Sequence, residues 1–209
     1  MKKILLTGCC LALSSIVLLA QDTYPVPEYA NEIYLVKKDP GITLLRLEKG
    51  SSKQEMKMKM MGMGGMDQGY ELEGDRSPVR LQGGSNLVFL LYTGSAGTST
   101  AQSDSMMKAN GMDPKTISEA MSMFTDPTKT TSLYDARPEK GKRRILLQSM
   151  GLLGKSKKTA TKYTVSIKKI QDGYYEMMVD KTLPRGEYSF VLMSMSMDQS
   201  FSLFAFAVE

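Results

Sequence analysis

The sequence predicts an all-β protein, an antiparallel β-sandwich with a short helical insertion near residues 113–124. Short segments of apolar or alternating residues recur along the chain. Turn signals such as Asp39-Pro40-Gly41 and Asp172-Gly173 separate them. In one region, residues 113–124, apolar residues recur at helical spacing instead. Regularly spaced short strands with turn residues between them are typical of a sandwich.

The predicted strands follow one another mostly as hairpins. Residues 21–30 come first and are extended, because Pro25 and Pro27 fix their own φ and restrict the preceding residues. The strands are predicted within residues 31–39, 42–50, 55–74 (a hairpin), 77–82, 86–92, 131–151 (two strands), 162–183 (two strands), 186–194 and 200–209. Each pair is joined by residues that favour turns.

Residues 95–128 form a predicted insertion between strands. Its opening is small and polar, so we expect a flexible loop there. Asp113 then fits a helix N-cap with Pro114 at the first helical position. Ile117, Met121 and Phe124 follow at helical spacing, which places them on one face of a short helix.

Residues 1–20 have the features of a secretory signal peptide. Lys2 and Lys3 precede an apolar stretch that ends at Ala20, and we expect cleavage after this residue. The protein is therefore expected to be exported and to reside in the periplasm, at the outer membrane or outside the cell.

Two other outcomes for this leader stay open. Cys9 or Cys10 could carry a lipid, or the leader could remain as an anchor, although it is shorter than the about 20 apolar residues of a membrane span. Cleavage after residue 20 removes both cysteines. Residues 21–209 are then expected to form one β-sandwich domain without disulfides.

The composition excludes several kinds of catalysis. The chain has no His, which rules out Ser-His-Asp and Cys-His nucleophile activation and nearly all zinc and haem sites. A hydrolase with paired carboxylates stays formally open, but no sequence signal pairs the acids. The prediction is a protein that is not an enzyme and that has no cofactor, apart from a candidate Cu(I) site.

That candidate metal site lies in residues 55–74, EMKMKMMGMGGMDQGYELEG. Thioether sulfur prefers the soft cations Cu(I) and Ag(I). The alternating methionines are expected on the inner face of a hairpin with the lysines pointing outward. Two alternatives stay open: methionines that fill the core, and a methionine-rich face for a partner. The candidate ligands are Met56, Met58, Met60, Met61, Met63 and Met66.

Residues 137–169 contain eleven Lys or Arg and one acid, Glu139. Such a patch can attract polyanions such as acidic glycans or lipopolysaccharide. The alternative is that these lysines protect strand edges from aggregation. The candidate polyanion-binding residues are Lys142, Arg143, Arg144, Lys155, Lys157 and Lys158. No nucleic-acid-binding motif accompanies them, so nucleic acid is not an expected partner.

Several strand and turn segments carry a resemblance. They are ANEIYLVKKD (30–39), ELEGDRSPVRL (71–81), SLYDARPEKGKRRILL (132–147), LPRGEYSF (183–190) and FAFAVE (204–209). The chain resembles a group of exported bacterial β-sandwich proteins of unknown function. The resemblance implies the fold, the exported location and a structural corner at residues 183–188, and it implies no activity.

The sequence thus favours an exported, non-catalytic binding or scaffolding protein of the bacterial cell envelope. Its expected partner is an envelope protein or a glycan, with peripheral association to the envelope as a further option. The alternatives are a methionine-rich Cu(I)- or Ag(I)-binding protein and a polyanion binder that uses the basic patch.

Overall fold

The structure is a computed structural model that describes residues 24–53, 55–58, 65–83, 87–94, 126–151, 157–193 and 200–209. Within these ranges the chain is built from β-strands and one four-residue helix, α3 (Pro127–Thr130). The predicted all-β class is confirmed. The two predicted features at residues 1–20 and 113–124 lie outside the described residues.

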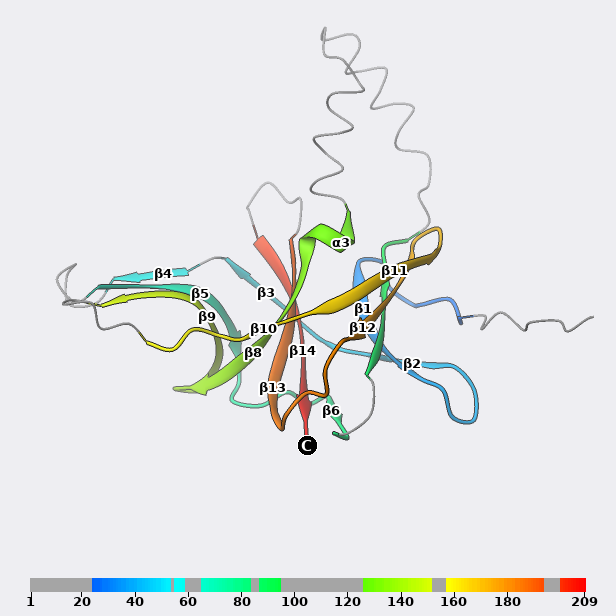
Figure 1. The fold of residues 1–209 in the computed structure, drawn as a ribbon, viewed down its shortest axis with the longest axis horizontal. Helices are drawn as coiled ribbons and strands as arrows, with labels where there is room; N and C mark the ends of the chain where they lie inside the picture. Colours follow the sequence, from blue (N-terminus) through cyan, green and yellow to red (C-terminus); the bar gives the residue numbers. More distant parts are fainter. Residues whose placement is uncertain are drawn as a thin grey trace, which may run out of the picture.

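The strands form two sheets, which Figure 1 shows beside each other. The five-stranded sheet has the order β11-β12-β7-β1-β2, and the main path of the nine-stranded sheet is β3-β14-β13-β8-β9-β5-β4. Strand β10 pairs with β8, and β6 runs parallel to β14. The bounds are β1 Glu32–Lys37, β2 Thr43–Arg46, β3 Glu48–Lys53, β4 Glu55–Met58, β5 Gly65–Glu73, β6 Arg80–Leu81, β7 Val88–Tyr92, β8 Thr131–Glu139, β9 Lys142–Gly151, β10 Lys162–Tyr163, β11 Val165–Gln171, β12 Tyr174–Val179, β13 Gly186–Met193 and β14 Ser200–Val208.

The main core lies between the two sheets. Phe89 of β7 contacts Phe190 of β13 and Phe206 of β14, with ring centroids 4.9 and 5.1 Å apart. All three rings are fully buried. They join further apolar side chains from both sheets in one cluster. Two antiparallel sheets with a shared apolar interior make a sandwich, as the alternating pattern predicted.

The predicted strand at residues 42–50 is in fact two strands in different sheets. β2 pairs with β1 in the five-stranded sheet, and β3 pairs with β14 in the nine-stranded sheet. Leu47 lies between them, is 2% exposed and donates its N–H to Ile33 O at 3.1 Å. The apolar side chain at the crossing point belongs to the main core, so this segment connects the two layers.

The local turn signals hold where the structure describes them. β8 and β9 are joined through Lys140 and Gly141, both with positive φ (55° and 80°). β11 and β12 are joined at Asp172 and Gly173, with φ of 78° at the glycine. Glycine adopts this backbone region without the Cβ clash of other residues, which explains why these dipeptides end strands.

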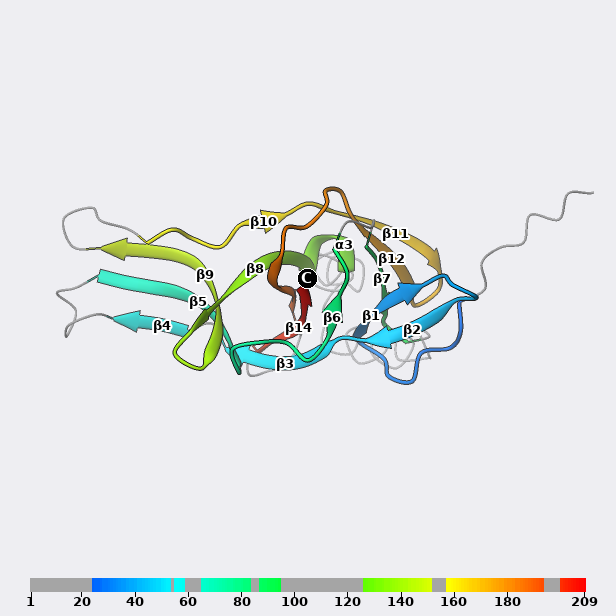
Figure 2. The same cartoon turned by 90° about the horizontal axis from the view of Figure 1, so that it is seen from below.

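Strands β4, β5 and β9 form an arm that extends from the body of the molecule (Figure 2). At its base, Tyr70 and Ile145 pack on Val191 and Leu203. Tyr70 also contacts Phe201, with centroids 4.8 Å apart. These contacts form a second apolar cluster, which fixes the base of the arm to β13 and β14.

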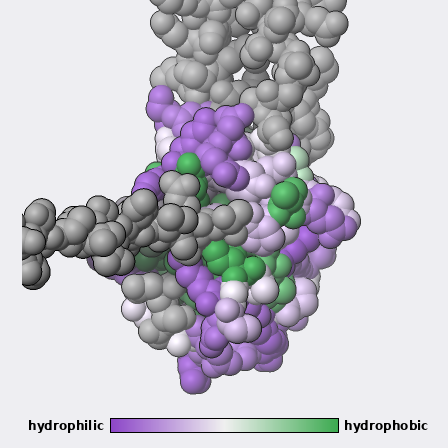
Figure 3. Space-filling model, turned by 90° about the vertical axis from the view of Figure 1, so that its right-hand side faces the viewer, coloured by the Kyte–Doolittle hydropathy of each residue, from purple (hydrophilic) through white to green (hydrophobic). Residues whose placement is uncertain are grey.

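The outer face of the five-stranded sheet carries a third, smaller cluster. It contains Tyr24, Val36, Leu90 and Tyr174, all buried. The Tyr24 hydroxyl donates a hydrogen bond to Glu176 of β12. On the side of the molecule seen in Figure 3, hydrophobic surface is visible as separate patches among hydrophilic residues.

The described helix lies at the end of the predicted insertion. Asp126 caps α3, and its side chain accepts a hydrogen bond from Thr128 N at 2.9 Å. Pro127 takes the first helical position, where a missing N–H costs nothing. In the described ranges, no helix has the length and apolar content of a membrane span.

Candidate functional site

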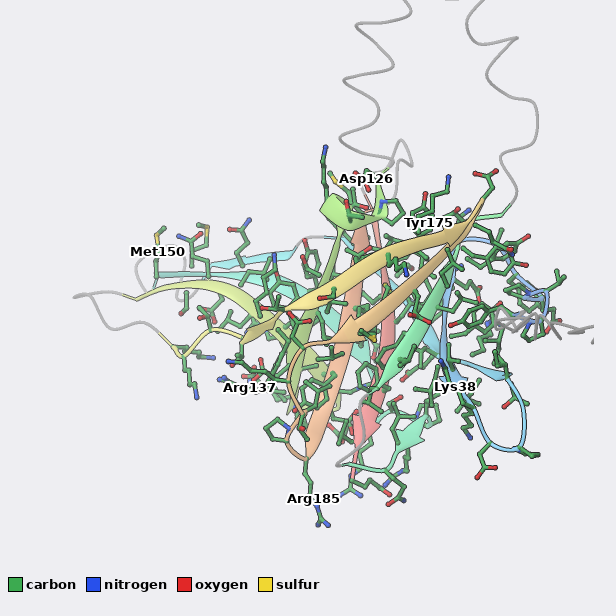
Figure 4. All side chains as sticks on the ribbon, turned by 45° about the vertical axis from the view of Figure 1, so that its right-hand side comes forward. Lys38, Asp126, Arg137, Met150, Tyr175 and Arg185 are labelled. Carbon is green, nitrogen blue, oxygen red and sulfur yellow. The ribbon has the colours of Figure 1, made fainter. Side chains whose placement is uncertain are left out.

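A cleft of about 470 Å³ lies where β8, β13 and the C-terminal end of β14 meet. Its most distinctive feature is four arginines, which come from different elements. Arg76 precedes β6, Arg80 lies in β6, Arg137 lies in β8 and Arg185 precedes β13. Figure 4 shows Arg185 pointing outward from the lower end of the molecule. The rest of the lining is Asp135, Ala136, Pro138, Tyr163, Pro184, Gly186, Glu187, Tyr188, Ala207, Val208 and Glu209.

The turn that carries Arg185 is held by a tyrosine corner. The Tyr188 hydroxyl donates a hydrogen bond to the carbonyl oxygen of Pro184 at 2.7 Å, four residues upstream. Burial, followed by the hydrogen bond with Tyr163, raises the pKa of Tyr188, so its hydroxyl stays protonated and remains a donor. Sandwich proteins use such corners to fix the entry into a strand. The structure therefore contains a corner within LPRGEY.

Replacing Tyr188 with phenylalanine tests the role of this corner. The change keeps the buried ring but leaves the Pro184 carbonyl without its donor. We expect the free energy of unfolding to fall by about 1–2 kcal/mol in urea denaturation. The matched control is Tyr175→Phe, a tyrosine at the margin of the main core. Equal stability of the Tyr188 variant and the wild type would contradict the role of the corner.

Each acid in the cleft is engaged by a cation or a backbone donor. Asp135 accepts the Thr161 N–H at 2.6 Å and lies 3.9 Å from Arg137. Arg80 forms an ion pair with Glu209.

Glu187 is held from behind the cleft. It accepts the Ser77 N–H at 2.8 Å and lies 3.8 Å from the guanidinium of Arg143. Arg143 itself does not line the cleft, so it offsets the charge of Glu187 without occupying the opening.

Two of the four arginines remain available. Within the described residues, Arg76 and Arg185 have no ion pair or side-chain hydrogen bond. Both are exposed. A guanidinium offers five N–H donors and binds carboxylates or phosphates through paired hydrogen bonds. The cleft is thus arranged to accept an anionic group.

Tyr163 of β10 adds an aromatic surface to the same cleft. Its ring is half-buried and packs edge-on against Tyr188, with centroids 5.5 Å apart. Because this contact already fixes the ring, a ligand that binds to it would restrict the side chain little further. Such an amphipathic side chain is common at binding surfaces.

The residues of the predicted basic patch do not form the exposed, unpaired cluster of cations that their number in the sequence suggested. Arg143 is 1% exposed and points into the protein. Its guanidinium binds both carboxylate oxygens of Glu48, at 2.6 and 2.7 Å, and donates to the carbonyl oxygens of Glu73 and Gly74. This arginine is a buried structural residue and cannot contact a polyanion at the surface.

The other members of the patch are mostly paired as well. Arg144 lies within 3.6 Å of Asp67, Glu71 and Glu139. Lys157 is 3.6 Å from both Asp67 and Glu139.

Lys142 contacts Glu73 at 3.0 Å and Glu71 at 3.5 Å. The hydrogen bond with Glu73, more than the proximity of Glu71, raises the pKa of Lys142. Lys158 is exposed, and Lys155 lies outside the described residues. The acids come mainly from β5, which pairs with β9, so they offset the positive charge that was counted along one segment.

Three of the six predicted metal ligands lie in strands that the structure describes. Met56 and Met58 lie in β4 and Met66 lies in β5, which confirms the hairpin. Its return strand begins at Gly65, earlier than the sequence indicated. The remaining candidates, Met60, Met61 and Met63, lie outside the described residues.

Met66 is partly exposed in β5, where the sequence indicated the hairpin loop. The inner face predicted for the alternating methionines falls on side chains outside the described part of the structure. The neighbouring Asp67 is 1% exposed and faces the covered side. Asp67 binds Ser149 and Arg144, so the covered side of β5 carries a polar network at this point.

Arg76 and Arg185 were not among the residues singled out from the sequence. Each lies in a loop, outside any charge run or periodic pattern. They meet because β13 pairs with β14 and β14 pairs with β6, and these contacts are between distant parts of the chain. The one available signal was LPRGEY, where a corner motif surrounds Arg185.

Comparison with protein-family models, with curated proteins and with solved structures finds no match to this chain.

Proposed function

We propose that this chain is an exported, non-catalytic binding protein of the bacterial cell envelope whose ligand is an acidic glycan. The observation that carries the proposal is the cleft between β8, β13 and β14, where Arg76 and Arg185 have no charged partner in the part of the chain that the structure describes. Sugars that carry carboxylate or phosphate groups present the planar or tetrahedral anions that arginine binds best.

The cleft has the size and the mixed character that a saccharide requires. Its volume of about 470 Å³ falls in the usual range for small-ligand sites. Tyr163 supplies a ring for the apolar face of a sugar, and the two arginines supply charge at the rim. The opening is partly exposed to solvent, which suits a few residues of a longer chain.

A binding role also agrees with how the acids of the cleft are used. Asp135 and Glu187 accept backbone N–H groups, and both lie near arginines. Both carboxylates are thus already engaged by donors of the protein itself.

The test is a calorimetric titration of the purified protein with trigalacturonic acid, a carboxylated trisaccharide. Maltotriose serves as the neutral control. We expect binding of the acidic sugar, weakening as salt is raised, and none of the neutral sugar. Inorganic phosphate in a third arm should compete if the arginines form the site.

Two variants assign that binding to the cleft. Arg76→Gln and Arg185→Gln each remove one guanidinium, and each should weaken binding about tenfold, the effect of losing roughly 1.4 kcal/mol of charged hydrogen bonding. Lys168→Gln, an exposed lysine of β11, is the matched control and should bind normally. Absence of trigalacturonate binding by the wild type, or equal losses in all three variants, would overturn the proposal.

A further inference from the structure

The arm brings two methionines of one hairpin together with a third that is far away in the sequence. In the strand register, Met58 of β4 is opposite Met66 of β5, and Met66 is opposite Met150 of β9. Residues directly opposite one another have Cβ atoms about 4.5–5.5 Å apart and share one face of the sheet. The three positions therefore form a row across the arm.

The two faces of the arm differ in chemistry. Asp67 and Ser149, the next register pair, are joined by a hydrogen bond of 2.7 Å and are buried. Side chains alternate along a strand, so Met66 and Met150 lie on the opposite face. Met150 is 50% exposed and labelled in Figure 4, where it points away from the arm.

The register pair next to the methionine row on the same face is uncharged. Gln68 and Gln148 are opposite each other and share the methionine face. The cations Arg144 and Lys157 instead contact Asp67 on the other face. A cation bound at the methionines would therefore not meet these two positive groups.

We propose that Met66 and Met150, together with Met58 at the adjoining register position of β4, form a thioether site for Cu(I) or Ag(I) on the arm. Soft thioether ligands select these soft cations over Zn(II) and Mg(II). Methionine is unbranched and adaptable, so neighbouring register positions suit the binding of one ion by several thioethers. In the described ranges, no group of three His, Cys, Asp or Glu side chains offers an alternative metal site.

This inference extends the candidate ligands beyond the methionine-rich stretch. Met150 was not among the residues singled out from the sequence, and it enters through the register of β5 with β9. Met66 lies at the centre of the row. We therefore expect Met66 to contribute most, since it is adjacent to both of the other positions.

The test measures Cu(I) binding anaerobically in competition with the chromogenic chelator bicinchoninate. The wild type should remove Cu(I) from the chelator and should ignore Zn(II). Met66→Leu and Met150→Leu keep volume and hydrophobicity and should fold normally. Each should weaken Cu(I) binding at least about tenfold, as expected for the loss of one ligand of three.

Met178→Leu is the matched control, because Met178 is 47% exposed and lies on β12 of the other sheet. It should bind Cu(I) as the wild type does. Addition of Ag(I) to protein with ¹³C-labelled methionine methyl groups should shift the Met66 and Met150 signals. The proposal is overturned if the wild type leaves Cu(I) with the chelator. It is also overturned if Met66→Leu and Met150→Leu bind like the wild type. Trigalacturonate binding should be unchanged in these variants, so the two proposals fail independently.

Discussion

Replacing Phe190 with alanine is expected to lower the free energy of unfolding by about 3–5 kcal/mol. Phe190 is fully buried and lies between the two sheets. Its ring centroid is 4.9 Å from that of Phe89 and 5.9 Å from that of Phe206. Removing the ring deletes buried apolar surface and leaves a cavity that rigid neighbouring rings can fill poorly.

This loss is large against the about 5–15 kcal/mol that stabilises a typical domain. It should be visible in urea denaturation followed by circular dichroism, as a lower midpoint with a similar slope. Val26→Ala is the control, because Val26 is 80% exposed, and its effect should be near zero. A Phe190→Ala protein within 1 kcal/mol of the wild type, a margin well below the about 3 kcal/mol expected, would contradict the shared core.

The second large effect is expected at Arg143. Arg143→Ala should cost about 3–5 kcal/mol, the usual effect of breaking a buried ion pair from one side. Glu48 would lose both of its charged hydrogen bonds, and the carbonyl oxygens of Glu73 and Gly74 would lose their donors. These contacts join β3, β5 and β9, so the base of the arm should loosen first.

Two further variants separate charge from packing at this position. Lys158→Ala removes an exposed cation of the same sequence region and should change stability by less than about 0.5 kcal/mol. Arg143→Met combined with Glu48→Met removes both charges of this pair and should recover part of the loss, because the Glu48 carboxylate is then no longer left without its partner. If Arg143→Ala and Lys158→Ala had equal effects, the buried role of Arg143 would be wrong.

The hairpins could be predicted because their signals are local. Gly141 and Gly173 adopt the positive φ that glycine favours, and alternation marks the strands on either side. The order of strands in the sheets follows from contacts between distant segments. The crossing at Leu47 is an example: apolar and charged residues alternate from Leu45 to Glu48 without a turn residue, so periodicity does not reveal that the chain changes sheets.

The charges of β9 were misread for a similar physical reason. Counting along residues 137–169 finds one acid, but Glu71 and Glu73 lie opposite Arg144 and Lys142 in the neighbouring strand. The electrostatic potential at a surface depends on all charged groups that lie nearby in space. A count along one segment of sequence omits the acids that the neighbouring strand contributes. The same limit hid Met150, whose partner Met66 lies in β5.

The cleft was beyond sequence reasoning because its components are isolated. Arg76 and Arg185 become neighbours through β6, β13 and β14, and neither stands in a charge cluster of its own. The sequence did indicate a corner at LPRGEY. The hydrogen bond from Tyr188 to Pro184 shows how that corner presents Arg185 at the rim.

The most direct test of the proposed function is a titration of ¹⁵N-labelled protein with trigalacturonic acid, followed by amide chemical shifts. Shifts should concentrate at the backbone amides of Arg76, Arg137, Arg185 and Glu187, with maltotriose causing none of them. The Arg185→Gln protein should show the same pattern at about tenfold higher sugar concentration. Shifts that concentrate instead on Lys157 and Lys158, or no shifts at all, would contradict a glycan site in the arginine cleft.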